Sequence, residues 1–375
     1  MASNVIGGAG ATPFATGNAL VRYNRSRRGS LAIWWKEIDR VTLGLVLILM
    51  AIGTISVAAA SPASAKRLST ASKQLTELHF FMLHIRWQLL GLFALFAAST
   101  LSKDMARRIG ILVASVMMLA LVFVPFVGSE VNGARRWLNL GISIQPSEFL
   151  KCGFPILLAW VLSWRTRDPK LPVMRVTMAI MGLVGVLLMA QPDFGATVLF
   201  GATWFALIML SGLGMRRIMI AVGAGVAAIA LTYLFYENGR NRINAFLGGG
   251  SAYDQVALAE RTLLNGGWFG RGFWMGNRKL SLPEAHTDYI FSSIGEEMGF
   301  FGCVGIMLLE LAIIARCIYV GAKCPDYMRR LVCFGIASAL MFQILINVGM
   351  CIGVMPVIGL TLPLISYGPS SVVSI

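Results

Sequence analysis

Long apolar runs separated by short polar segments dominate the chain. Runs of membrane-spanning length recur at ten places. They cover residues 41–60, 80–100, 109–128, 147–164, 173–190, 194–211, 218–236, 288–315, 331–352 and 364–375. Because a backbone surrounded by lipid has to satisfy its own hydrogen bonds, each run predicts a helix. The pattern therefore predicts an all-α polytopic membrane protein, a bundle of ten transmembrane helices whose last member is cut short.

Composition narrows the class of protein. Of the 375 residues, 57% are hydrophobic and only 13% are charged, whereas soluble domains carry about 25% charged residues. The net charge of +15 comes without any motif that reads RNA or DNA, so no nucleic-acid partner is expected. The six cysteines form no Cys-x-x-Cys pair, and the three histidines lack the spacing of metal ligands. A soluble enzyme and a dedicated metal site are thereby disfavoured.

The distribution of lysine and arginine orients the predicted helices. With a cytoplasmic N-terminus, most basic residues fall in cytoplasmic segments, as the positive-inside rule requires. Residues 1–40 are then a flexible cytoplasmic tail, and residues 41–375 form a single transmembrane domain. The segment 237–287 becomes a large periplasmic loop between helices seven and eight. Within it, YDQVALAERTLLN has helical periodicity and predicts an amphipathic or re-entrant helix.

Asp288 stands where the polar stretch PEAHTD meets the next apolar run. Its carboxylate could cap the free N–H groups of a helix start. It could also act as a general base toward a substrate hydroxyl at the membrane surface, with Glu284 and His286 tuning its pKa. The residues alone leave both interpretations open.

Two glutamates follow inside the same run, Glu296 and Glu297. Carboxylates within a membrane segment are costly, so they are either functional or paired with a cation. The expected partners for a structural ion pair are Lys151, Arg86 and Arg136.

The stretch RRWLNLGISIQPSEFLK contains a helix start at Pro146, with Glu148 in its first turn and Lys151 one turn further on. This spacing predicts an ion pair between Glu148 and Lys151. The preceding Arg136 and Trp137 suit either a phosphate-bearing headgroup or an ordinary interfacial anchor. In QPDFG, Asp193 is expected to cap the helix that follows a tight turn.

Four blocks in this order resemble the SEDS family (shape, elongation, division and sporulation): GARRWLNLGISIQPSEFLK, AQPDFGAT, LPEAHTDYIFSSIGEEMGFFG and NVGMCIGVMPVIGLTLPLISYG. The resemblance runs from about residue 40 to the last residue. The forms LPEAHTD and GLTLPLISYG are closer to the cell-division branch of the family than to the elongation branch.

This resemblance implies a peptidoglycan glycosyltransferase that polymerises lipid II during septal cell-wall synthesis, by inverting transfer with Asp288 as general base. The leaving pyrophosphate would face Arg136, Lys151 and either Arg240 or Arg242. No metal ligand is implied, although a divalent cation such as Mg²⁺ or Mn²⁺ could assist. The substrate-binding residues implied by the matching blocks and their neighbours are Arg136, Trp137, Gln145, Ser147, Glu148, Lys151, His286, Thr287 and Glu296.

The same resemblance implies partners and a location. The partners are lipid II and its undecaprenyl-pyrophosphate glycan, membrane lipid, a class B penicillin-binding protein and other division proteins. The location is the bacterial inner membrane, with enrichment at the septum. The sequence departs from the family at two positions. Pro369 stands where a glycine is usual. Val357 stands where many division members carry a basic residue, which Arg278 or Lys279 could replace. Two rival functions are a lipid II flippase and a non-catalytic scaffold that activates the penicillin-binding protein.

Overall fold

A computed structural model describes residues 30–69, 74–131, 134–139, 141, 143–247 and 251–375. The chain divides into two compact units, residues 1–43 and residues 44–375. Most of the predicted N-terminal tail, residues 1–29, lies outside the described residues. From Ser30 to Glu37 the chain forms helix α2.

Each predicted apolar run contains a helix, although the last run is helical only over Pro369–Ser374. The helices are α3 (Arg40–Leu68), α4 (His79–Ser99), α5 (Lys103–Val127), α6 (Pro146–Ser163), α7 (Val173–Ala190), α8 (Phe194–Leu210), α9 (Met215–Phe235), α12 (Ile290–Lys323), α13 (Tyr327–Cys351) and α14 (Pro369–Ser374). Within the described residues, seven of them are long and apolar enough to cross a membrane, namely α3, α4, α5, α7, α9, α12 and α13. Helix α8 is apolar but shorter. The chain is thus a predominantly helical, multi-pass membrane protein.

Side-chain caps define several helix starts, as local chemistry predicts. The Asp193 carboxylate accepts a hydrogen bond from the backbone N–H of Ala196 at 3.2 Å, which confirms the predicted cap of α8. Ser102 caps α5 and Asp326 caps α13 in the same way. Pro146 occupies the first turn of α6, as predicted.

A small antiparallel sheet interrupts the otherwise helical fold and departs from the all-α prediction. Strands β1 (Ser129–Val131), β2 (Ala134–Asn139) and β3 (Ser143–Ile144) pair in the order β1-β2-β3 between α5 and α6. The alternation of apolar and polar residues in LNLGISI is the signal for it. For this stretch, the sequence predicted only the helix start at Pro146 that follows it.

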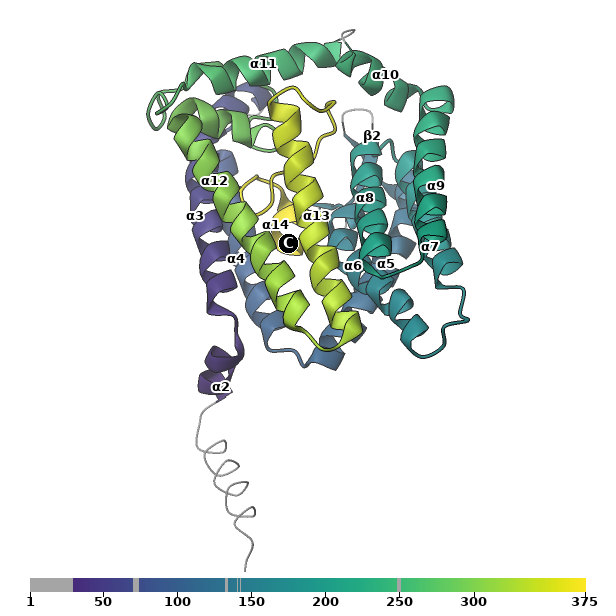
Figure 1. Ribbon diagram of the computed structural model, residues 1–375. Coiled ribbons are helices and arrows are strands. Elements are labelled where there is room, and N and C mark those ends of the chain that lie inside the picture. Colours follow the sequence, from purple (N-terminus) through teal and green to yellow (C-terminus); the bar gives the residue numbers. More distant parts are fainter. Residues whose placement is uncertain (1–29, 70–73, 132–133, 140, 142, 248–250) are drawn as a thin grey trace, which may run out of the picture. The chain divides into compact units, whose positions relative to one another are not determined.

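Two further helices and two short 3-10 turns complete the described chain. Helices α10 (Glu237–Phe246) and α11 (Ser251–Asn265) lie in the predicted periplasmic loop, where they run across one end of the helices of residues 44–375 (Figure 1). Helix α11 packs on α12 and α13. The 3-10 turns are η1 (Trp164–Thr166) and η2 (Arg278–Leu280). The helix predicted within the loop is confirmed.

Helix α12 is broken at Gly299, whose φ of 70° is non-helical. The segment 266–270 packs directly against the break, so that a Cβ at Gly299 would lie 2.3 Å from the backbone N of Gly270. The backbone N–H of Phe300, freed by the break, donates to the carbonyl of Gly267 at 2.9 Å. The loop thus supplies hydrogen bonds that a continuous helix would have made internally.

The apolar core has two main clusters, and α13 contributes to both. One cluster joins α3, α12 and α13 and includes Ile344 of α13. The other joins α5, α6, α7 and α8 and includes Leu331 of α13. A smaller third cluster links α8 and α13 to the segment that follows α13, through Ile358 and Leu360. This segment, residues 353–368, is hereafter the C-terminal loop, and it approaches the residues predicted to carry chemistry.

Candidate active site

Asp288 lies in a run of turns just before α12, not in the helix itself. Helix α12 begins at Ile290 with Tyr289 at the N-cap position, and no side chain caps this end. The capping interpretation of Asp288 is therefore wrong. The carboxyl group instead faces the C-terminal loop, where a Cβ added at Gly359 would lie 3.3 Å from Asp288 Oδ2.

The surroundings of Asp288 raise its pKa from its ordinary value to about 7. Burial is the main cause, because it removes water from the charged form, and the negative charges of Glu284 and Glu148 add to it. The positive charges of Arg136 and Lys151 act in the opposite direction. A half-buried carboxyl group with this pKa exchanges its proton near neutral pH.

Arg136 is placed by the small sheet. It lies on β2, and its side chain crosses to the turn between α7 and α8. There Nε donates to the carbonyl of Gln191 at 3.3 Å, and Nη2 donates to the carbonyl of Pro192. Trp137, the next residue, is half-buried and pairs with Ser129 in the sheet. The sheet that sequence analysis missed is therefore the element that positions this arginine.

Glu148 and Lys151 form the predicted ion pair on α6. Lys151 Nζ lies 2.6 Å from Glu148 Oε1, and both side chains are almost fully buried. The other carboxylate oxygen of Glu148 has no hydrogen-bond partner in the described structure. Ser147 beside them is buried as well, and the backbone N–H of Gln145 donates to Ser370 Oγ at 3.1 Å.

Arg242 of α10 is a further charged residue near Arg136 and Asp288. Its Nη1 donates to the carbonyl of Val357 at 2.7 Å. Burial and the positive charge of Arg136 lower its pKa, while the negative charges of Asp193 and Asp288 raise it. Arg136 and Arg242 thus reach the Asp288 region from two different elements. Of the two candidates Arg240 and Arg242, it is Arg242 whose charge acts on Asp288.

The side chains of His286 and Thr287 are engaged in contacts within the protein. The ring of His286 is buried, its Nδ1 lies 2.7 Å from Ser64 Oγ on α3, and it stacks on Tyr367. Burial lowers its pKa to about 4, so it is neutral at pH 7. Thr287 donates its hydroxyl to the Glu284 carboxylate at 2.9 Å. Both residues hold the turn that carries Asp288.

Glu296 binds the loop between α9 and α12. Its carboxylate accepts hydrogen bonds from Asn265 Nδ2 at 2.7 Å and from the backbone N–H groups of Arg278 and Lys279 at 2.8 and 2.9 Å. Glu297 pairs with Lys279 Nζ, with both side chains buried. The expected cation partners of these glutamates were wrong, because Lys279 from the loop pairs with Glu297 and uncharged donors from the loop bind Glu296. Lys279 is accordingly engaged and does not replace the missing basic residue near Val357.

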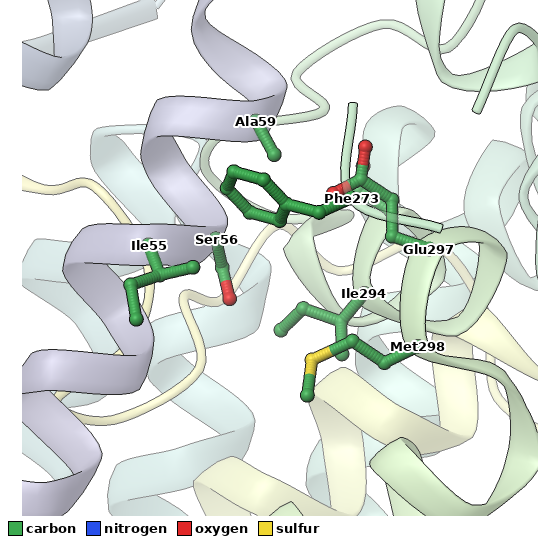
Figure 2. A pocket seen from close by; sticks show the side chains of 8 residues that line it. Ile55, Ser56, Ala59, Phe273, Ile294, Glu297 and Met298 are labelled. Carbon is green, nitrogen blue, oxygen red and sulfur yellow. The ribbon is translucent and has the colours of Figure 1, made fainter. Parts of the chain in front are cut away.

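A small pocket lies between α3 and α12. Figure 2 shows the Phe273 ring between the α3 side chains, Ser56 among them, and Glu297 of α12. The carboxylate of Glu297 is already neutralised by Lys279. Asp288 does not line this pocket, so the pocket is separate from the site around Asp288.

Fold and site together define a class of protein. It is a multi-pass helical membrane protein with a half-buried carboxyl group and several cations gathered where a surface loop meets the helices. Residues 39–375 match the model of the FtsW/RodA/SpoVE family, which is described as "Cell cycle protein". The chain therefore belongs to this family, and the resemblance to the SEDS family is confirmed.

Individual relatives agree with this membership. "Probable peptidoglycan glycosyltransferase FtsW" of Aromatoleum aromaticum is 36% identical over 361 residues, which cover 90% of this chain and 85% of the relative. The protein of the same name in Caulobacter vibrioides is 29% identical over 359 residues, covering 95% and 91%.

Solved structures of relatives share the fold. A chain of a peptidoglycan synthase complex, studied for its coordination of polymerization and crosslinking, superposes with a TM-score of 0.72 at 28% identity, covering 90% of this chain and 94% of that one. The crystal structure of the rod shape determining protein RodA of Thermus thermophilus gives 0.65 at 27% identity, covering 91% and 93%.

Proposed function

We propose that this chain is a peptidoglycan glycosyltransferase that polymerises lipid II in septal cell-wall synthesis. The names of its relatives support this activity. The observation that carries the proposal is the Asp288 carboxyl group, half-buried and with a pKa of about 7. A general base works best when its pKa lies near the working pH, because it is then both ionised and basic enough to take a proton.

In the proposed reaction, the 4-hydroxyl of the acceptor GlcNAc attacks C1 of the donor MurNAc. The new O–C1 bond forms as the bond from C1 to the undecaprenyl-pyrophosphate oxygen breaks, and the hydroxyl proton passes to the Asp288 carboxylate. The α-linked donor gives a β-linked product, so one displacement with one base suffices. Glycosidases, in contrast, place two carboxyl groups around the bond.

The pyrophosphate leaves with the electron pair of the broken bond and needs positive charge nearby. Arg136 and Arg242 are proposed to supply it, because the positive charges of both interact with the Asp288 carboxylate. Lys151 is held by Glu148 and is proposed to set the local charge, with Trp137, Gln145 and Ser147 lining the substrate path. No group of three or more metal-type ligands gathers in the described residues, and no step here uses a cation cofactor.

His286, Thr287 and Glu296 are proposed to act on the substrate only indirectly. Their side chains are engaged with Ser64, Glu284 and the periplasmic loop, respectively. They would hold the Asp288 turn and the loop above it in place for the substrate.

Topology and partners complete the proposal. Ten helical segments, α6, α8 and the six-residue α14 included, would form the bundle in the bacterial inner membrane, with α14 crossing only part of it. The N-terminus would lie in the cytoplasm, and residues 237–287 would be the periplasmic loop between helices seven and eight. Residues 1–40 would be a cytoplasmic tail and residues 41–375 one domain. A class B penicillin-binding protein and other division proteins would be the partners at the septum, because polymerised strands have to be crosslinked.

The test is polymerisation of labelled lipid II by the purified protein with its cognate penicillin-binding protein. Wild type is expected to make long glycan chains, and Asp288→Asn none. The control is Asp104→Asn, which removes an exposed carboxylate from α5 and is expected to leave polymerisation unchanged. Equal chains from wild type and Asp288→Asn would show that the base lies elsewhere or that the protein is a scaffold.

The flippase alternative makes a different prediction. A path across the membrane lined by Glu296 and Arg86 is not favoured here, because Glu296 is occupied by three hydrogen bonds and Arg86 is exposed on α4. Loss of lipid II flipping in Glu296→Gln, with polymerisation intact, would support that alternative.

A further inference from the structure

The backbone that carries Asp288 is held from three directions. The three consecutive carbonyl oxygens of residues 286–288 accept hydrogen bonds from Tyr367 N at 2.9 Å, Ser366 Oγ at 2.8 Å and Asn347 Nδ2 at 2.8 Å. The first two donors belong to the C-terminal loop. The third belongs to α13, and it is bonded to Asp288 itself.

Asn347 uses both of its amide N–H groups in this arrangement. Its Nδ2 donates to the carbonyl of Asp288 at 2.8 Å and to the carbonyl of Leu360 at 2.6 Å. The side chain is fully buried, and its Oδ1 has no hydrogen-bond partner among the described residues. Rotating the amide would set Oδ1 against two carbonyl oxygens, so the chemistry allows only the orientation with the NH₂ group between them.

The two carbonyls that Asn347 joins belong to the turn that carries Asp288 and to the C-terminal loop that the Asp288 carboxyl group faces. Leu360 follows Gly359, whose φ is +72° and whose backbone closely approaches Asp288 Oδ2. A bridge from Asp288 to Leu360 therefore sets the separation between the carboxyl group and the loop that walls it. A buried polar side chain in an apolar helix is costly, and this bridge is the interaction that offsets the cost.

We propose that Asn347 is a positioning residue for Asp288, which fixes the carboxyl group against the C-terminal loop in the geometry needed for proton transfer. This inference rests on the proposed function, in which Asp288 is the general base. Asn347 itself touches neither substrate nor the reacting atoms. Without it, the Leu360 carbonyl loses the donor that Asn347 supplies, and the Asp288 carbonyl keeps only the weak Cys351 Sγ donor at 4.0 Å. The turn and the loop are then free to move apart.

The same helix offers a matched control. Gln343 lies one turn before Asn347, is also buried, and donates through Nε2 to the carbonyl of Thr361 at 2.8 Å. It binds the C-terminal loop but not Asp288. Gln343→Leu therefore removes a comparable buried amide while leaving the Asp288 bridge in place.

The first experiment measures kcat and KM for lipid II polymerisation by the complex with the penicillin-binding protein. Asn347→Leu is expected to lower kcat about 100-fold, the cost of misplacing a catalytic group by about 1 Å, with KM little changed. Gln343→Leu is expected to change neither by much. An unchanged kcat in Asn347→Leu, or equal losses in both variants, would overturn the proposal. If Asn347→Leu does not fold, Asn347→Ser, which keeps one hydroxyl donor, is compared with Gln343→Ser.

A second readout does not depend on activity. Carbodiimide coupling of glycine ethyl ester to carboxyl groups, followed by mass spectrometry, reports the labelling of Asp288 relative to exposed Glu284 nearby. The ratio is expected to rise in Asn347→Leu and to stay at the wild-type value in Gln343→Leu. An unchanged ratio in both variants refutes the positioning role. Active Asp288→Asn would instead refute the proposed function, so the two failures are distinguishable.

Discussion

At the scale of single residues, the site depends on how charges surround one carboxyl group. Burial, Glu284 and Glu148 raise the pKa of Asp288, while Arg136 and Lys151 oppose them. The group is therefore protonated below about pH 7 and ionised above it. Since only the ionised form can accept a proton, the proposed activity falls as the pH falls through 7.

This balance predicts a pH effect for Glu284→Gln. Removing the negative charge lowers the pKa of Asp288, so the ionised form persists to lower pH and the acidic limb of the kcat profile moves down. At pH 6, where wild type retains about a tenth of its activity for a pKa near 7, the variant is expected to be more active. The measurement is kcat for lipid II polymerisation between pH 5 and 8.

A screening control accompanies that measurement. Glu284 is exposed, so the difference between the variant and wild type should shrink as salt is raised. Identical acidic limbs at low salt would mean that Glu284 does not act on Asp288, or that another group controls the limb.

At the scale of elements, the break in α12 explains how the loop between α9 and α12 is held. The helix stops being regular at Gly299, and the segment from Asn265 to Lys279 docks on the exposed backbone and on the two glutamates. Glu296 and Glu297 therefore hold the loop against α12 through hydrogen bonds and an ion pair. The sequence predicted that these carboxylates lie inside a continuous membrane helix. In the structure, α12 is broken at Gly299, directly after them.

We expect Glu296→Gln to weaken this docking. An amide offers only one acceptor oxygen to three donors, and each buried donor left without a partner costs about 1–3 kcal/mol. Thermal unfolding in detergent should shift to lower temperature, and protease cleavage between residues 265 and 280 should become faster.

The control is another buried glutamate on the same helix. Glu310 has Oε1 without a hydrogen-bond partner among the described residues, so Glu310→Gln removes an ionisable group without breaking a network. It should leave the loop as resistant to protease as in wild type. Faster loop cleavage in Glu310→Gln, or none in Glu296→Gln, would contradict the role assigned to Glu296.

At the scale of the whole molecule, α13 connects the two apolar clusters and also carries Asn347. Its residues pack on α12 on one side and on α6 and α8 on the other. The charges of the site come from β2, α6, α10 and the turn before α12, and they meet where these packed groups adjoin. The site is therefore a product of how the helices assemble.

The proposed topology is tested by labelling single cysteines in a cysteine-free background with a membrane-impermeant maleimide. Cysteines at the exposed positions Asn139 and Ser281 should react in intact spheroplasts, because the proposed topology places both on the periplasmic side. A cysteine at exposed Asp168 should react only after permeabilisation. Labelling of all three positions in intact cells would refute the orientation.

The helices and the family could be predicted from the sequence because their signals lie between near neighbours in the chain. Apolar runs of spanning length, the Asp193 cap and the pair of Glu148 with Lys151 all involve residues a few positions apart. The small sheet left a visible alternation as well, although it was not recognised. A buried asparagine in the apolar stretch LINVGMC was a similar signal for Asn347.

Other features required the folded chain. Lys279 reaches Glu297 across 18 residues, and Asn347 reaches Asp288 across 59. Arg242 comes to the Asp288 region from α10. No local pattern encodes these pairs. Hydrogen bonds and charge interactions depend on distance in space, whatever the separation of the residues along the chain. Apolar length and residue type determine that the protein crosses the membrane and bears a candidate base, whereas helix packing decides which groups surround that base and therefore its pKa.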